Sequence, residues 1–252
     1  MKLSTKSKMK VGERQPYVGE LVFTAFSGSH QDAINKGVQY MQTSGTDVWE
    51  VPYLPIDPAD IGRVYEPVVR INSQSGKGGV AFIMDTYFGF KLPKAMHKEF
   101  ANVIQAISEK QGEVSPEQIM KAFSEAYLDR KEPIHFRRLK VDEMGTDSAF
   151  DTRVHVLYTD HGVEKSFEAI GNGPIDAVKR GLAEALNIDI KILDYEEHAL
   201  QSGSNSQAAA YIHLLDSDTG HVTYGVGVSS NITRASVRAI FSAVNRLGLG
   251  EK

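Results

Sequence analysis

The chain has 252 residues, of which 41% are hydrophobic and 24% are charged, which is enough for one large or two modest globular domains. It contains no cysteine, which excludes disulfides, thiolate metal sites and cysteine nucleophiles and fits a cytoplasmic location. The net charge of −4 with mixed signs argues against a nucleic-acid or anionic-membrane partner, and no segment approaches the roughly 20 apolar residues that cross a bilayer.

The first part of the chain, up to residue 132, is predicted to be mainly helical and rich in turns. Ser29 lies three residues before Asp32, an arrangement similar to a capping box, and predicts a helix over residues 30–42. Residues 51–58 (VPYLPIDP) contain three prolines, which fix their own φ and favour extended conformations before them. We expect a rigid strap at this point.

Two further helices are predicted before residue 133. Pro93 is expected to open the first, whose apolar residues fall at helical spacing: Met96, Phe100, Val103, Ile104 and Ile107. Ser115, followed by Pro116 and Gln118, is expected to cap the second. The inner face of that helix is predicted to carry Ile119, Phe123, Ala126 and Tyr127.

After residue 133 the hydrophobic period changes, and the remainder can be aligned with itself. Each half is predicted to contain three strands and one helix. The first half has strands near 136–141, 152–158 and 165–170 and a helix to about 186; the second has strands near 190–199, 208–215 and 221–228 and a helix to about 247. The predicted fold class is therefore α+β, with helical accessory subdomains over 1–133 and a duplicated βββα domain over 134–252. Two such layers should pack together, within a chain or across a dimer.

Residues 73–79 (SQSGKGG) resemble a phosphate-binding loop at first sight. A Walker motif needs a glycine where Ile71 stands and a serine or threonine where Gly78 stands, so nucleotide hydrolysis is rejected. Backbone amides beside Lys77 remain candidates for holding an anion such as the phosphates of coenzyme A, but a tight turn that opens a short helix is favoured.

The predicted repeats place similar turns before their helices, at residues 171–174 (GNGP) and 229–231 (SSN). Pro174 suits the first helical position, and the glycines permit close approach of a ligand to the backbone. Two helix N-termini are thus able to present amides to a carboxylate. From the residues alone, tight turns without a ligand are the favoured interpretation.

Four segments in order, 21–34 (LVFTAFSGSHQDAI), 51–58, 72–80 (NSQSGKGGV) and 171–174, resemble 2-isopropylmalate synthases of the longer type over nearly the whole chain. The resemblance is to the part after the catalytic TIM barrel. The His-x-His metal motif of that barrel is absent, since the histidines stand at 30, 97, 135, 155, 161, 198, 213 and 221. The resemblance implies that this chain binds no cofactor and that the divalent metal belongs to the missing barrel. It also implies that the chain alone is inactive.

The resemblance also implies roles for particular residues. The family condenses acetyl-CoA with 2-oxoisovalerate, the first committed step of leucine biosynthesis, and His30 and Tyr53 would reach the active site of the neighbouring subunit of a homodimer. Without the resemblance, the residues favour a structural role for His30 and a packing role for Tyr53. A helix N-terminus nevertheless disfavours an imidazolium, so His30 in that position would be neutral and able to accept a proton. The L-leucine effector site would comprise Gly171, Asn172, Gly173, Pro174, Ile175, Ile192, Tyr195, Ala199, Ser206 and Ala208.

Two alternatives stay open. Behind the leading hypothesis of a 2-isopropylmalate synthase, the chain would also suit a stand-alone amino-acid-binding regulatory module without catalysis, or part of a related citramalate or homocitrate synthase. A neighbouring coding region that supplies the barrel with its His-x-His motif would separate the first alternative from the enzyme.

Overall fold

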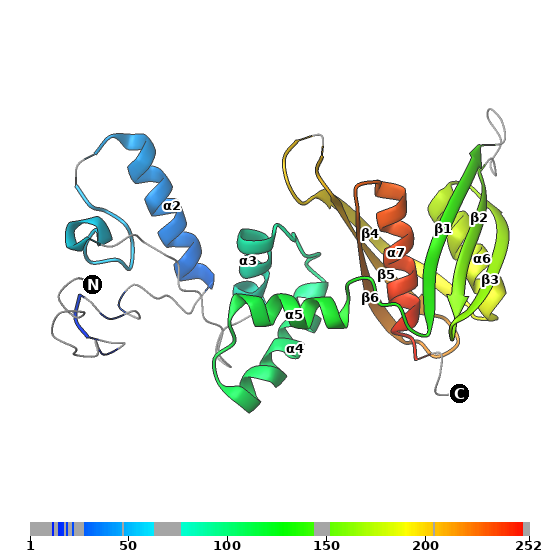
Figure 1. Cartoon of the computed structure of the whole chain (residues 1–252). Coiled ribbons are helices and arrows are strands. Elements are labelled where there is room, and N and C mark those ends of the chain that lie inside the picture. Colours follow the sequence, from blue (N-terminus) through cyan, green and yellow to red (C-terminus); the bar gives the residue numbers. More distant parts are fainter. Residues whose placement is uncertain are drawn as a thin grey trace. The chain divides into compact units, whose positions relative to one another are not determined.

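The computed structural model describes residues 12, 15–17, 19, 22, 28–46, 48–62, 77–143, 152–203 and 205–248. The chain forms two compact units, one from residues 1–87 and 97–119 and one from residues 88–96 and 120–252. The described helices give way to strands between residues 126 and 134 (Figure 1). The predicted domain boundary at residue 133 stays a prediction.

The first unit is built around the helix α2 (Gly28–Ser44) and a turn that packs on it. Ile34, Val51 and Leu54 are buried together, and the indole nitrogen of Trp49 donates to the carbonyl of Leu54 at 2.8 Å. The 3₁₀ helix η2 (Pro58–Ile61) follows, capped by Asp57. The predicted helix over 30–42 is confirmed, but the capping box is wrong, because α2 begins at Gly28 and Ser29 lies within it.

The predicted strap is extended only in part. Asp57 has the extended backbone expected before a proline, with φ −66° and ψ 123°. Residues 51–54 instead form a turn, in which the N–H of Leu54 donates to the carbonyl of Val51 at 3.3 Å. Pro52 occupies the second position of this turn, where its fixed φ is favoured, so this proline favours a reversal of the chain and not an extended segment.

The helices α3 (Lys77–Phe88), α4 (Met96–Gln111) and α5 (Pro116–Ala126) complete the helical part. α4 begins three residues after Pro93, whose carbonyl accepts from the N–H of Met96 at 2.9 Å. The capping box of α5 is confirmed: Ser115 Oγ accepts from the N–H of Gln118 at 3.4 Å, and Gln118 Oε1 accepts from the N–H of Ser115 at 2.8 Å. The predicted stripe of α4 is also confirmed, with Met96, Phe100 and Ile104 fully buried.

The duplicated βββα domain is confirmed strand by strand. The first repeat contains β1 (Ile134–Glu143), β2 (Thr152–Asp160), β3 (Val163–Gly171) and α6 (Pro174–Leu186); the second contains β4 (Ile190–Ala199), β5 (Ala208–Asp216), β6 (Val222–Ser229) and α7 (Ile232–Asn245). Each repeat forms an antiparallel three-stranded sheet in sequence order. The first strands share a bulge at the same place, between Phe136 and Arg138 in β1 and between Ile192 and Asp194 in β4.

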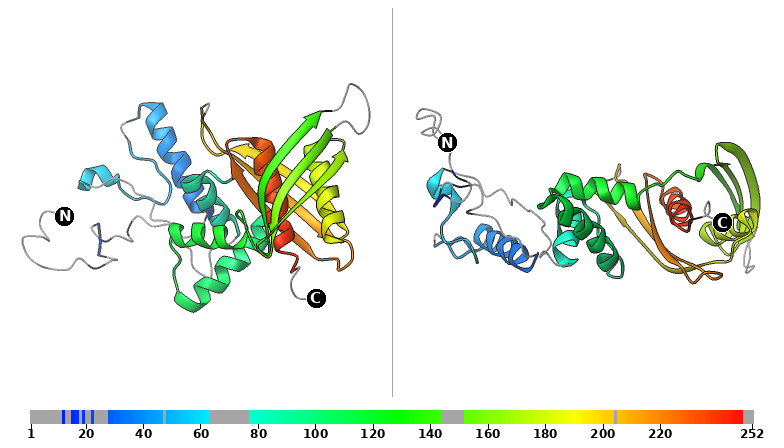
Figure 2. Two further views of the ribbon diagram at one scale, coloured as in Figure 1. Left: turned by 45° about the vertical axis from the view of Figure 1, so that its right-hand side comes forward. Right: turned by 90° about the horizontal axis from the view of Figure 1, so that it is seen from below.

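The two repeats pack on each other within one chain, one of the two arrangements left open by the sequence. α6 covers β2 and β3, and α7 covers β5 and β6 while also contacting β1 (Figure 2). Phe241 of α7 lies 5.6 Å from Phe136 and 5.9 Å from Tyr158, between ring centroids. A single hydrophobic core therefore joins both sheets and both helices.

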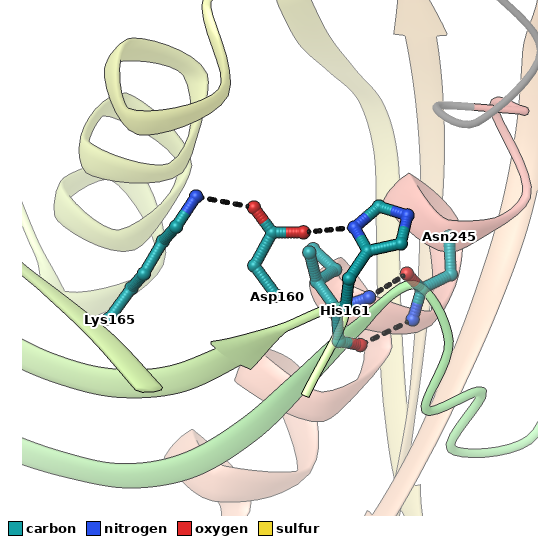
Figure 3. Close-up of polar contacts among 5 residues, drawn as sticks. Asp160, His161, Lys165 and Asn245 are labelled. Atoms are coloured by element: carbon teal, nitrogen blue, oxygen red, sulfur yellow. Dashed lines mark hydrogen bonds and ion pairs between the residues drawn. The ribbon is translucent and has the colours of Figure 1, made fainter. Parts of the chain in front are cut away.

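Two polar groups fix the ends of the first sheet (Figure 3). The Asn245 carboxamide accepts from the N–H of Ile134 at 2.9 Å and donates to its carbonyl at 2.7 Å, so α7 positions the start of β1. Asp160 accepts from Lys165 at 2.6 Å, and this bond lowers the pKa of the Asp160 carboxyl below its ordinary value, against a smaller effect of burial. His161 contacts the same carboxylate at 2.7 Å.

The approach of α7 to β6 depends on glycine. A Cβ built on Gly225 would lie 2.1 Å from the carbonyl oxygen of Ala239, and one built on Gly227 would lie 2.1 Å from that of Ala235. Both neighbours are helix backbone atoms, which cannot turn aside as a side chain can. The helix lies directly on the strand because neither residue has a side chain.

We expect Gly225→Ala to destabilise the fold by about 1 to 3 kcal/mol, the usual cost of overpacking a dense core. Chemical denaturation would measure the change. Gly78→Ala is the matched control, since a Cβ on Gly78 meets nothing within 4 Å. Equal stabilities for the two variants would show that α7 shifts without cost.

Candidate functional site

His30 and Tyr53, the two residues proposed from the resemblance as catalytic, lie in contact. Their rings stack with centroids 4.0 Å apart and planes 25° apart. His30 is the third residue of α2, and Tyr53 is the third residue of the turn at 51–54. The structure thus brings together two residues separated by 23 positions in the sequence, which no spacing argument predicts.

The backbone of Tyr53 explains how its ring reaches His30. Its φ is 63°, the left-handed region in which a turn of this type normally places glycine. A tyrosine held there costs of order 1 kcal/mol or more of backbone strain. Tyr53 remains 61% exposed, and His30 is exposed as well. An imidazole and a phenol in contact, both open to solvent, are able to exchange protons with a molecule outside this unit.

A second candidate site lies where β3 turns into α6. Gly173 precedes the helix with φ 177° and ψ 172°, Pro174 is its first residue, and no side chain caps this N-terminus. Gly171 is buried, and a Cβ on it would lie 2.5 Å from the backbone nitrogen of Ala177. Gly171 therefore permits the tight turn, whereas a Cβ on Gly173 meets nothing within 4 Å and leaves open space before the helix.

A pocket of about 480 Å³, called the α6 pocket below, lies beside this turn and is lined by Asn172 and Ile175 on either side of it. Three of its lining residues belong to the predicted effector set: Asn172, Ile175 and Ile192. The other three are charged and were missed by the sequence reading: Asp176, Lys179 and Lys191. Its size is within the range of small-molecule sites. The sequence does show charged residues near the start of the helix, Asp176 and Lys179, but it does not show that Lys191 of the next strand lies beside them.

Asp176 organises the charged side of the α6 pocket. Burial acts to raise the pKa of this carboxyl, but the bonds from Arg180 and from the N–H of Asn172, together with nearby Lys179, lower it below its ordinary value. Arg180 Nε donates at 2.8 Å, and Lys179 Nζ lies 3.4 Å away. The carboxylate is therefore ionised at neutral pH and faces a pocket that also holds lysine ammonium groups.

The remaining predicted effector residues do not line the α6 pocket. The Tyr195 hydroxyl contacts Glu197 and lies 3.0 Å from Ser236 Oγ on α7. Ala199 and Ala208 pair across β4 and β5. Ser206 Oγ accepts from the N–H of Gln201 at 3.2 Å and lies in the connection between those strands. Within this chain the predicted set is divided along β4 and does not form one enclosed pocket.

The turn before α7 is equivalent to the turn before α6 in the sequence repeat, but the N-terminus of its helix is capped differently. Asn231 caps α7 with its own side chain, which accepts from the N–H of Arg234 at 2.9 Å. Ser229 Oγ in turn accepts from the N–H of Asn231 at 3.2 Å. Because the chain satisfies these amides itself, the N-terminus of α6 is the better carboxylate site of the two.

Within the described ranges, no three histidine, aspartate or glutamate side chains gather as metal ligands would. No helix in that part of the chain is both long and apolar enough to cross a bilayer.

Comparisons with known proteins match both parts of the chain. Residues 20–85 match the family described as alpha-isopropylmalate synthase, post-catalytic domain-like, and residues 113–248 match the LeuA allosteric (dimerisation) domain. The chain is 46% identical over 243 residues to the 2-isopropylmalate synthase of Clostridium acetobutylicum, covering 95% of this chain and 43% of that protein. It is 45% identical over 249 residues to the enzyme of that name from Mycobacterium leprae, covering 95% of this chain and 40% of that protein. The chain thus spans about two fifths of the length of these relatives.

Proposed function

Because the chain belongs to the LeuA allosteric (dimerisation) domain family and corresponds to the C-terminal part of 2-isopropylmalate synthases, we propose that it senses L-leucine. In the complete enzyme it would impose feedback inhibition on the condensation of acetyl-CoA with 2-oxoisovalerate. The observation that carries this proposal is the α6 pocket, which lies within the matched LeuA domain and joins three predicted effector residues to charged side chains.

The chemistry of the α6 pocket suits a zwitterion with an aliphatic side chain. The uncapped N-terminus of α6 and the ammonium groups of Lys179 and Lys191 attract a carboxylate, and Asp176 attracts an ammonium group. Ile175 and Ile192 offer apolar surface to the side chain. The polar groups fix the ligand's orientation, and the isoleucines favour a branched aliphatic ligand.

We assign His30 and Tyr53 to the catalytic step of the complete enzyme. Their exposed, stacked rings would act on substrate held by the catalytic barrel of a neighbouring subunit, with His30 as proton acceptor and Tyr53 as hydrogen-bond donor. The divalent metal belongs to that barrel in this proposal. The isolated chain would then show no thiol release from acetyl-CoA.

A homodimer is part of the same proposal. The matched domain is one of dimerisation, and β3 is an edge strand whose Val163 and Ile170 are 61% and 40% exposed. Predicted effector residues that stand apart in one chain, Tyr195, Ala199, Ser206 and Ala208, would meet a ligand where two copies join.

Isothermal titration of the purified chain tests the leucine proposal. We expect L-leucine to bind, and L-valine to bind about tenfold more weakly, because one methylene in an apolar pocket is worth about 1 to 3 kcal/mol. A thermal shift that rises with the logarithm of leucine concentration should accompany the heat. A folded chain that gives neither heat nor thermal shift at millimolar leucine would remove the effector site.

A further inference from the structure

A second pocket lies where the first strand of the first repeat meets the helix of the second repeat, whereas the α6 pocket lies where the first strand of the second repeat meets the helix of the first. The strand side of this second pocket is formed by His135 and Phe136, the second and third residues of β1. In the α6 pocket the strand side is formed by Lys191 and Ile192, the second and third residues of β4. The helix side of the new pocket comes from α7, through Arg238 and Phe241, and we call it the α7 pocket.

Unlike the α6 pocket, the α7 pocket is also lined by the segment that leads into the domain. Asp129, Arg130 and Lys131 line it, and α7 holds their backbone in place. Ser242 Oγ accepts from the N–H of Arg130 at 3.2 Å, and the Asn245 carboxamide donates to the carbonyl of Arg130 at 2.7 Å. Two hydrogen bonds from one helix therefore fix the backbone on this side of the pocket.

The charge of the α7 pocket is strongly positive. Arg130, Lys131 and Arg238 are cationic, and Asp129 is the one carboxylate among its lining residues. Arg238 lies 3.5 Å from Asp129, and its guanidinium also donates to the carbonyl of Val228 at 2.6 Å. His135 adds no charge at neutral pH, because burial and the nearby Arg137 and Lys131 lower its pKa below the ordinary value.

The floor of the α7 pocket is aromatic. Phe136 and Phe241 are 8% and 1% exposed, with ring centroids 5.6 Å apart. The volume is about 170 Å³, below the range of drug-sized ligand sites, so an occupant has only a few non-hydrogen atoms. Cations at the rim and aromatic rings at the floor favour a carboxylate that carries a short apolar tail.

We propose that the α7 pocket is a second binding site, distinct from the α6 pocket, for a short-chain carboxylate such as a branched 2-oxo acid or a small α-amino acid. The carboxylate meets Arg130 and Lys131, and the tail lies on Phe136 and Phe241. An occupant would join the 129–131 segment to α7, and therefore stiffen the chain at the entrance to the LeuA domain. The assignment does not depend on leucine binding at the α6 pocket.

The test is calorimetric titration of the full chain with 2-oxoisovalerate and, separately, with L-leucine, each in a Gly173→Val background that weakens binding at the proposed α6 site. We expect at least one probe to bind, and Arg130→Gln or Lys131→Gln to weaken that binding about tenfold through loss of a charge-assisted hydrogen bond. Lys121→Gln is the matched control, since Lys121 is 76% exposed on α5 and lies outside the pocket.

Asp129→Asn separates the two classes of occupant. It should tighten binding of the 2-oxo acid, which has no group for the carboxylate to attract, and weaken binding of the amino acid, whose ammonium group Asp129 would hold. Absence of binding by both probes at about 10 mM, a concentration on the order of the dissociation constant of a very weak site, would overturn the proposal. So would binding that Arg130→Gln, Lys131→Gln and Lys121→Gln leave unchanged. Leucine binding to the unmodified chain, with neither probe binding the Gly173→Val chain, would support the α6 site and refute the α7 site.

Discussion

In a full-length enzyme that carries this sequence, we expect His30→Ala to lower kcat about 100-fold with little change in KM, as the loss of a general base does. The stacking of His30 on Tyr53 makes the pair a unit, so the effects of changing both residues should not add. Steady-state kinetics of thiol release would measure the two parameters.

Tyr53 offers a sharper distinction, because its ring and its hydroxyl have separate tasks. Tyr53→Phe keeps the ring on His30 and removes only the hydrogen-bond donor, so a fall in kcat would assign a role to the hydroxyl itself. Tyr53→Gly should leave the fold intact, since glycine adopts the φ of 63° without strain. Wild-type kcat in both His30→Ala and Tyr53→Phe would show that the proposed roles are wrong.

The regulatory domain was predictable from the sequence because its hydrophobic residues repeat at short intervals and because the residues that start its helices act locally. Strands such as β2 alternate buried and half-buried residues, and the helices begin at Pro174 and after Asn231, where proline and asparagine favour a start. The same local chemistry gave the capping box of Ser115 and Gln118. It failed at Ser29, where a suitable residue lies inside a helix that begins earlier.

The candidate sites were less predictable, because they depend on which residues meet across the fold. Lys191 enters the α6 pocket only because β4 of one repeat lies beside the helix of the other. The stack of His30 on Tyr53 depends on a left-handed tyrosine, a conformation that sequence patterns assign to glycine. The turns before α6 and α7 looked equivalent, and only the bond from Asn231 to the N–H of Arg234 distinguishes them.

The variant expected to affect leucine most directly is Gly173→Val. A Cβ on Gly173 meets nothing within 4 Å, and its φ of 177° is extended backbone that valine readily adopts before a proline. The fold should therefore survive, while the new side chain occupies the space through which a carboxylate reaches the amides that open α6. A hydrogen bond to a charged group is worth about 1.5 to 3 kcal/mol, so binding should weaken about 100-fold.

The comparison with other substitutions makes this test specific. Ala208→Phe should also abolish binding by filling the proposed site. Because Ala208 packs against the hydrophobic core, a loss of binding heat in that variant counts only if the variant is shown to be folded. Gly171→Val should unfold the turn, because its Cβ would lie 2.5 Å from the backbone of Ala177. Gly12→Val makes the same chemical change in open space far along the sequence and serves as the control. Titration of Gly173→Val with unchanged affinity and a native melting temperature would place the leucine carboxylate elsewhere than at the start of α6.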